Sequence, residues 1–255
     1  MTRNLCVLTV IAVVMVSCKS SYQVVNVERS RILVDACYDS HYDMEASRFL
    51  DTYRHVIDSI TSPVVGRMAR SLHVQRPESE LSNLLADIMV WAAKDYGEHV
   101  DFGVYNMGGI RADLPAGAVT YGDVLDIAPF ENKIAFATLS GADVLVLFSE
   151  MASVGGEGVS HAVRMVITKD GKLVSATING QVVDPQRDYR IATIDYLLDG
   201  TDKMSAFHKA KDVNSPLSDE NNSRFVIMNY FREMDRQGKL VDSQMEGRFV
   251  EQKIT

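Results

Sequence analysis

Residues 104–132 read VYNMGGIRADLPAGAVTYGDVLDIAPFEN. A mostly apolar run that begins at Val100 stops at Asn106, and the pair Gly108-Gly109 comes before Arg111. Glycine pairs are typical of places where the backbone adopts positive φ or lies against another group. An amide and a guanidinium beside such a turn offer several donors to a small, oxygen-rich ligand. An ordinary strand and turn with a solvated arginine is the alternative interpretation.

The composition is that of a folded globular protein, with 46% hydrophobic and 24% charged residues in 255. This length is enough for one large domain, or for one domain with a lead-in segment. The formal net charge is −8. A protein that follows the phosphates of a nucleic acid carries a basic surplus, so we expect no nucleic-acid partner.

The N-terminus has the pattern of an export signal. Arg3 precedes a nearly continuous apolar run from Leu5 to Val16, which is shorter than the roughly 20 residues of a membrane span. The ending Ser17-Cys18 resembles a bacterial lipobox, which implies removal of residues 1–17 and lipidation of Cys18. The protein would then be exported and held in the cell envelope through a membrane-inserted lipid anchor. A plain secretory signal or a short anchor is the alternative.

The three cysteines of the chain give no evidence of a disulfide framework or a zinc site. Cys6 and Cys18 belong to the N-terminal signal region, and after processing only Cys37 of the three would follow the lipidated residue. Cysteines this few and scattered fit neither a disulfide scaffold nor the spacing of zinc ligands.

Hydrophobic periodicity predicts an α/β or α+β domain with mixed sheets flanked by helices. Residues 18–75 are interpreted as a tether and lead-in helix, and residues 76–255 as the main domain. Helices are expected over 43–60, 79–96, 141–151 and 224–237, with Ala142, Leu145, Val146 and Phe148 of the third turned inward. Strands are expected over 30–37, 102–105, 119–126, 134–139, 162–168, 173–178, 181–183 and 189–194, and a last short segment over 245–249.

Two turns complete this organisation. Asn179-Gly180 between two strands predicts a tight hairpin. The sequence GGEG at 155–158 lacks the following Gly-Lys-Ser/Thr of a P-loop and is interpreted as a flexible loop.

Several strings, in this order, resemble one family, the C-terminal domain of bacterial and animal 5′-nucleotidases. ESELSNLLAD at 78–87 resembles its E-S-x-L-G-N-L-x-A-D, and NMGGIR at 106–111 resembles N-x-G-G-I-R. YGDV at 121–124 with PFEN at 129–132 is similar to Y-G-D-V…P-F-x-N, and DP at 184–185 with YRIAT at 189–193 and DYL at 195–197 matches the closing strand. The resemblance covers roughly Arg76 to the C-terminus.

The resemblance implies a fold for recognising the nucleoside part of a nucleotide. Phe130 and Tyr196 match the two rings that sandwich the base, and stacking one ring contributes roughly 1–3 kcal/mol. Asn106 and Arg111 match polar contacts, and Asp202 matches the aspartate that accepts from the ribose hydroxyls. For each ring taken singly, core packing is the alternative.

The sequence departs from the family at several positions. Gly200-Thr201-Asp202-Lys203 replaces G-G-D-G, which puts the assignment of Asp202 most in doubt. Ser82 and His161 replace glycines. Arg76 lies one residue away from an additional family arginine, so it is only a possible contact.

Family members hydrolyse phosphate esters with two divalent metals in an N-terminal metallophosphatase domain. The six histidines of this sequence are scattered singly, and Asp39-Ser40-His41 echoes D-x-H without its partner motifs. Ser160-His161 is not expected to be a nucleophile–base pair. We therefore expect no catalytic residue, metal or cofactor on this chain, with divalent metals carried by a partner phosphatase.

Three hypotheses follow from this combination. The chain is the nucleotide-recognition part of a 5′-nucleotidase completed by a separately encoded metallophosphatase, or a non-catalytic nucleoside-binding surface lipoprotein, or a remnant whose pocket has decayed.

Overall fold

The structure is a computed structural model and describes residues 22–38 and 43–252. The predicted signal peptide (residues 1–17), the lipidation residue Cys18 and the Asp39-Ser40-His41 triplet lie outside these ranges. The chain divides into two units, residues 1–49 and 50–255.

Among the helices of the described residues, none has both the length and the apolar character that crossing a bilayer requires.

The N-terminal part differs from the sequence prediction in one element. The strand expected over residues 30–37 is wrong: this segment pairs with no strand of the described chain, and it ends in η1 (Ala36–Tyr38), a single 3-10 turn. A strand is stable only when its backbone groups are paired. The predicted helix over 43–60 is confirmed as α2 (Met44–Thr61), all of whose residues are exposed or half-buried.

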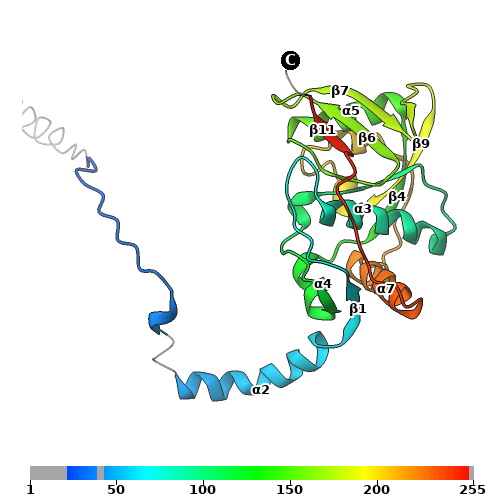
Figure 1. Cartoon of the computed structure of the whole chain (residues 1–255). Coiled ribbons are helices and arrows are strands. Elements are labelled where there is room, and N and C mark those ends of the chain that lie inside the picture. The colour runs from blue at the N-terminus through cyan, green and yellow to red at the C-terminus, as the bar shows by residue number, and fades with distance from the viewer. Residues whose placement is uncertain (1–21, 39–42, 253–255) are drawn as a thin grey trace, which may run out of the picture. The chain divides into compact units, whose positions relative to one another are not determined.

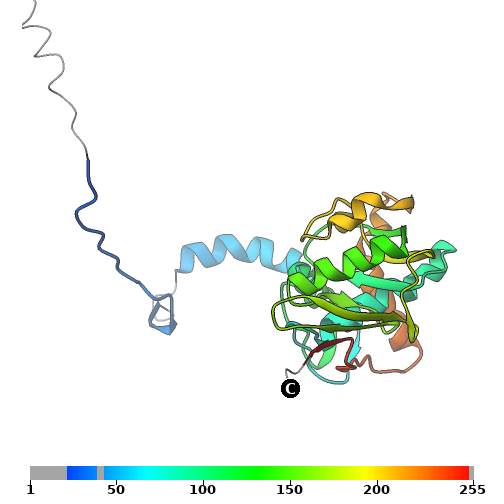
Figure 2. The same cartoon turned by 90° about the horizontal axis from the view of Figure 1, so that it is seen from above.

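Residues 50–255 hold the remaining elements (Figures 1 and 2). The helices are α3 (Glu80–Ala92), η2 (Ala93–Tyr96), η3 (Met107–Gly109), α4 (Tyr121–Ile127), α5 (Gly141–Ser153), α6 (Asp195–Leu198), η4 (Ser205–Lys209), η5 (Asp219–Asn221) and α7 (Ser223–Arg236). The strands are β1 (Val64–Met68), β2 (Phe102–Tyr105), β3 (Gly117–Thr120), β4 (Ile134–Ser140), β5 (Gly158–Val159), β6 (Val163–Ile167), β7 (Leu173–Ile178), β8 (Gln181–Val182), β9 (Asp188–Ile194), β10 (Lys211–Asn214) and β11 (Phe249–Glu251).

The strands form three sheets. The largest has the order β10-β4-β9-β2-β5, a second has the order β11-β6-β7-β8, and β1 pairs with β3. The pairs β2–β9 and β11–β6 are parallel and the others are antiparallel, so the predicted mixed α/β class is confirmed. β1 lies before the boundary predicted at residue 76 and pairs with β3 after it.

Helices α3 and α5 cover opposite faces of the five-stranded sheet. Neighbouring residues of a strand point to opposite faces. The ring of Phe102 meets that of Phe148 of α5 at 5.5 Å between centroids. A Cβ on the next residue, Gly103, would stand 2.5 Å from the carbonyl oxygen of Ala86 in α3, so only glycine lets the helix approach this closely. The core therefore lies on both sides of β2, whose four residues are all buried.

Several predicted elements match the structure closely. β2 has the predicted bounds, α3 and η2 fill the predicted helix over 79–96, and α7 lies within one residue of its predicted bounds. Ser79 caps α3 by accepting from the amide of Ser82, and Gly97 ends η2 in the left-handed conformation. Asn179 and Gly180 both have positive φ, as a tight hairpin turn requires.

The strand expected over residues 119–126 is wrong from Tyr121 onward. β3 stops at Thr120, and α4 begins at Tyr121. The Thr120 side chain accepts from the backbone N–H of Asp123, and the Asp123 carboxylate accepts from that of Thr120. This capping box satisfies orphan donors at the helix start and turns a β-like stretch into a helix.

The predicted inward face of α5 also needs correction. Of the four residues expected inside, only Phe148 is buried; Leu145 is half-buried, and Ala142 and Val146 are exposed. The buried stripe consists of Gly141, Val144, Leu147, Phe148, Met151 and Ala152. Apolar residues lie on both faces of this helix, so packing against β4 and β9 selects the inward one.

Candidate functional site

The connections of the central sheet bring distant segments to one edge. Because β2 and β9 are parallel, their carboxyl ends lie at the same edge of the sheet. β4 is antiparallel to β9, with Ile134 opposite Ile194, so the segment before β4 reaches that edge too. The Asn106 turn, Phe130 and Tyr196 therefore converge there.

A cavity of about 290 Å³ lies at this edge. It is lined by Asn106, Gly108, Gly109, Arg111, Phe130, Asn132, Tyr196 and Asp202. All five residues that the sequence nominated for ligand contact are in this set, although the ligand role of each stays a prediction. Asn132 is an addition; it lies inside the PFEN string and was not singled out from the sequence.

The two aromatic rings are accessible. Phe130 is 47% exposed and Tyr196 is 40% exposed, while most other phenylalanines of the domain are sealed in the core. An apolar ring held half in water beside polar groups is typical of ligand cavities. Core packing, the alternative for each ring, does not fit this exposure.

Asp202 is held by two other cavity residues. Its Oδ2 accepts from Asn106 Nδ2 at 2.5 Å, and its Oδ1 accepts from Tyr196 Oη at 3.3 Å. Both bonds orient the carboxylate toward the cavity. An ionised carboxylate accepts several hydrogen bonds at once, so Asp202 keeps capacity for hydroxyl groups of a ligand.

Asn106 is almost fully buried and has one unsatisfied atom. It is 3% exposed, and its Oδ1 has no hydrogen-bond partner among the described residues. A Cβ at position 109 would lie 2.8 Å from this oxygen, so Gly109 is required for Asn106 to fit. Arg111 is exposed, and its Nη1 lies 3.5 Å from the Gly108 carbonyl oxygen, which leaves its other donors open to a ligand.

Glu157 fixes the backbone of the Asn106 turn, which the sequence did not predict. It is 2% exposed; Met107 N donates to its Oε2 at 2.5 Å and Arg76 Nη2 to its Oε1 at 2.5 Å. Burial raises the pKa of the Glu157 carboxyl, although the Met107 N–H and Arg76 oppose this. The possible contact Arg76 is thus committed to Glu157 and is not among the residues that line the cavity.

The interpretation of residues 155–158 as a loop holds for residues 155–157, which belong to no helix or strand, but their backbone is closely packed and the loop ends in a strand. Gly158 belongs to β5 and pairs with Tyr105, and Gly156 has a φ of 111°. A Cβ on Gly156 would stand 2.2 Å from the carbonyl oxygen of Pro77. Glycine is used here for close packing rather than for mobility.

The residues around Asp202 keep a glycine-like backbone although two of the three family glycines are replaced. Gly200, Asp202 and Lys203 all have positive φ, of 69°, 51° and 65°. The lost glycine at 203 therefore leaves the conformation in place at the cost of strain, which for a non-glycine residue is of order 1 kcal/mol.

We expect Lys203→Gly to raise the free energy of unfolding by about 0.5–1 kcal/mol, because glycine adopts this backbone without strain. Urea denaturation measures the difference. Lys239→Gly, at an exposed lysine that has no positive φ, is the control and should be neutral or destabilising. A destabilised Lys203→Gly variant would show that the side chain contributes contacts that outweigh the strain.

Ser160 and His161 engage different partners. Ser160 Oγ accepts from Gly103 N at 2.9 Å, whereas the exposed His161 ring lies 2.8 Å from Glu246 Oε2. Within residues 22–38 and 43–252, no group of three or more His, Cys, Asp or Glu residues is placed to hold a metal ion.

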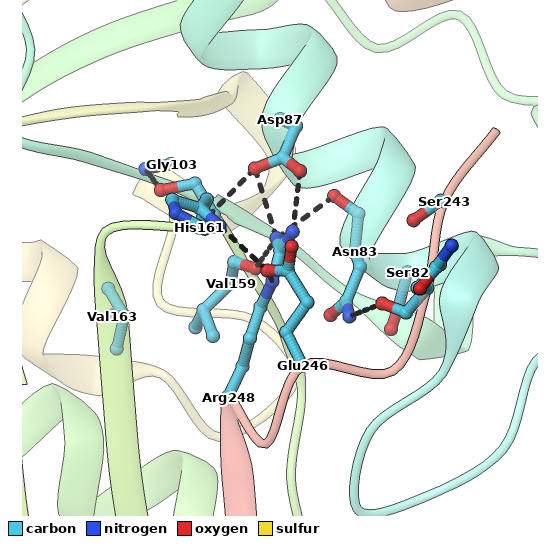
Figure 3. A network of polar contacts seen from close by, with 12 residues as sticks. Ser82, Asn83, Asp87, Gly103, Val159, His161, Val163, Ser243, Glu246 and Arg248 are labelled. Carbon is cyan, nitrogen blue, oxygen red and sulfur yellow. Dashed lines mark hydrogen bonds and ion pairs between the residues drawn. The ribbon is translucent and has the colours of Figure 1, made fainter. Parts of the chain in front are cut away.

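A second polar cluster holds the C-terminal segment against the domain (Figure 3). Arg248 is 2% exposed; its Nη1 and Nη2 donate to the two Asp87 oxygens at 3.0 and 2.6 Å, and its Nε donates to Glu246 at 3.0 Å. Nη1 also donates to the carbonyl oxygen of Val159 in β5 at 2.7 Å.

Glu78 completes this cluster from the other side of the segment. Its Oε1 accepts from Asn83 Nδ2 at 2.7 Å and from Glu246 N at 2.8 Å. Glu78, Asn83 and Asp87, three polar residues of the string at 78–87, therefore act in structure rather than in ligand contact.

Comparison with known proteins gives the family. The sequence model of the 5′-nucleotidase C-terminal domain matches residues 56–209. The silent protein UshA(0) of Salmonella typhimurium is 36% identical over 117 residues, which are 45% of this chain and 21% of that protein. The cell wall protein Lmo0130 of Listeria monocytogenes is 29% identical over 188 residues, 68% of this chain and 24% of that protein. The chain thus spans about a fifth to a quarter of these relatives.

A solved structure has the same fold. The 5′-nucleotidase precursor from Thermus thermophilus superposes with a TM-score of 0.71 and 23% identity, over 84% of this chain and 44% of that one. The family match covers more than half of the chain, and the strings quoted from residues 78–132 lie within it. The chain belongs to the 5′-nucleotidase C-terminal domain family.

Proposed function

We propose that these 255 residues form the nucleotide- or nucleoside-recognition part of a 5′-nucleotidase-type phosphoesterase that acts in nucleotide catabolism. The observation that supports this function most directly is the single cavity lined by Asn106, Arg111, Phe130, Tyr196 and Asp202. These residues come from separate segments, and their side chains supply the apolar faces, the acceptor and the cation that a nucleotide needs.

Each part of a nucleotide has a partner of matching chemistry. The base stacks between Phe130 and Tyr196, because every base has a π-face. The Asp202 carboxylate accepts from the two ribose hydroxyls. The Arg111 guanidinium, exposed beside Gly108, attracts the phosphate.

Phosphate-ester hydrolysis in this proposal needs a second protein. The family chemistry uses two divalent metals, and the described residues offer no donor set that fits them. Hydrolysis is therefore assigned to a metallophosphatase outside this chain, which we propose is separately encoded and carries the metals. Lipidation of Cys18 would hold the recognition part at a membrane of the cell envelope, where nucleotides arrive from outside.

Binding is tested by calorimetric titration of the full chain with adenosine and with AMP. Phe130→Ala and Tyr196→Ala are each expected to weaken adenosine binding about 5- to 150-fold, as the loss of one stacked ring predicts. Tyr22→Ala, at a ring that is 95% exposed in the N-terminal unit, is the control and should leave binding unchanged. No heat of binding for either ligand would favour a decayed pocket and overturn the proposal.

Catalysis is tested by mixing. Phosphate release from AMP should require this chain, a metallophosphatase chain and a divalent metal together, and chelation should abolish it. Adenosine binding with no turnover in any mixture would instead support a non-catalytic nucleoside-binding surface lipoprotein.

A further inference from the structure

A second cavity of about 740 Å³ adjoins the first. Asn132 and Tyr196 line both cavities. The second cavity continues along η4 and β10 to Ser215 and Leu217, which also line it. No family motif discussed above accounts for most of its wall.

If the proposed nucleoside recognition holds, the wall shared by the two cavities determines how a bound nucleotide is oriented between them. Arg111 and Asp202 line only the first cavity. A nucleotide that places its phosphate and ribose on these two residues leaves its base toward Asn132 and Tyr196. A group attached to the far edge of the base then enters the second cavity.

The wall of the second cavity combines apolar and acidic side chains. Val213 and Leu217 line the cavity and are 54% and 82% exposed, so their aliphatic side chains are accessible to an alkyl group of a ligand. Asp195 and Asp199 bring two carboxylates. One oxygen of Asp195 already accepts from the backbone of Lys133 and Tyr196, whereas Asp199 is exposed at the end of α6.

The cavity has little positive charge to offset these carboxylates. His208 Nε2 is 2.9 Å from the backbone carbonyl oxygen of Asp199, and that ring nitrogen is therefore committed as a donor. The nearby Lys133 amine lies 3.3 Å from Asp219 and is not among the lining residues. An anionic group would be repelled, while an alkyl chain with a terminal amine meets apolar contact first and a carboxylate at its end.

We propose that the second cavity is a subsite for an amine-bearing alkyl substituent on the edge of the base, so that the ligand class includes base-modified nucleosides. The juxtaposition of Tyr196, the exposed aliphatic residues and Asp199 is what selects this class over unmodified nucleosides. This inference rests on the proposed function and narrows its substrates.

The test is a calorimetric titration of the full chain with four probes: adenosine, N6-hexyladenosine, N6-(6-aminohexyl)adenosine and N6-(5-carboxypentyl)adenosine. The aminohexyl probe should bind about tenfold more tightly than adenosine, since burying two methylene groups alone accounts for a factor of that order. The hexyl probe should bind slightly more weakly than the aminohexyl probe, and the carboxylated probe should bind more weakly than the hexyl probe.

Two variants locate the effect. Asp199→Asn should remove the preference for the aminohexyl over the hexyl probe, a factor of about three, as expected for a solvent-exposed ion pair. Asp188→Asn, at an exposed aspartate at the opposite end of β9, should keep that preference. Adenosine binding should be unchanged in both variants, which also shows that they are folded.

The outcomes separate the two ideas. If adenosine itself does not bind, the proposed function fails and the subsite fails with it. If adenosine binds but the hexyl and aminohexyl probes bind no more tightly, the subsite is overturned and nucleoside recognition stands. Equal loss of preference in both aspartate variants would also overturn the subsite.

Discussion

Replacing Arg248 with alanine is expected to lower the free energy of unfolding by about 2–4 kcal/mol, because it removes a buried guanidinium and its hydrogen bonds, although the carboxylates of Asp87 and Glu246 are 36% and 31% exposed and keep part of their hydration. The guanidinium is 2% exposed and joins α3, β5 and the C-terminal segment through Asp87, Val159 and Glu246 (Figure 3). β11, which follows directly, would lose part of what holds it beside β6.

Chemical denaturation and thermal unfolding measure this effect. For a domain of this size, the loss corresponds to roughly 4–16 °C in Tm. Arg236→Ala is the matched control, since its ion pair with Glu233 has a 73% exposed arginine and should contribute less than about 1 kcal/mol. A loss below about 1 kcal/mol in Arg248→Ala would mean that solvent replaces the cluster and that the C-terminal segment is held by other contacts.

Replacing Glu157 with alanine is expected to lower the free energy of unfolding by about 2–4 kcal/mol and to weaken adenosine binding about tenfold. The change leaves the buried Met107 N–H without an acceptor, and a buried unsatisfied group costs about 1–3 kcal/mol. It also leaves Arg76 unpaired, an effect reduced because that side chain is 38% exposed. Binding suffers because the turn that carries Asn106 is no longer fixed against Asp202.

The variant Glu157→Gln separates the effect of the hydrogen-bond acceptor at this position from the effect of the negative charge. The amide keeps an acceptor for Met107 but turns a donor toward Arg76, so we expect an intermediate loss in both measurements. Glu220→Ala, at an exposed glutamate of η5, is the control and should change neither. Full adenosine affinity in a folded Glu157→Ala variant would contradict a positioning role, whatever the loss of stability.

The difference in stability between the wild type and Glu157→Gln should depend on pH, and its sign follows from the direction in which the pKa of Glu157 is shifted. Burial raises the pKa of Glu157 above its ordinary value of 4.5 in the folded state. The folded protein then binds this proton more tightly than the unfolded chain, so the contribution of Glu157 to stability falls as pH rises from 4.5 through the raised pKa. Urea unfolding between about pH 4.5 and 7 should therefore show that the free energy of unfolding of the wild type rises relative to that of Glu157→Gln as the pH falls. An opposite slope would show that Arg76 and the Met107 N–H outweigh burial.

Local patterns in the sequence were enough for much of the fold. The stripe in residues 79–96 and the caps at Ser79 and Gly97 define α3 and η2, because helix periodicity and capping are properties of neighbouring residues. Asn179-Gly180 defines its hairpin for the same reason. The resemblance to the family nominated five residues that line one cavity, although no periodicity could have placed Asn106 beside Asp202.

Prediction from local patterns failed where the same pattern was compatible with two different local structures. Residues 119–126 alternate well enough for a strand, and the reciprocal bonds between Thr120 and Asp123 decide for a helix. In α5, apolar residues occupy more than one face, and the choice of Val144 over Val146 as a core residue depends on the sheet beneath.

The sequence by itself determined the longer helices, most of the strands and the family, because these depend on residues that are close together or on strings in a fixed order. Only the tertiary structure decided what Glu157, Arg248 and the polar residues of 78–87 do. Their decisive partners lie far away in the chain, as Arg76 does from Glu157 and Asp87 from Arg248. A buried charge is stabilised by whatever the fold brings within hydrogen-bonding distance, and separation along the chain carries no information about that distance.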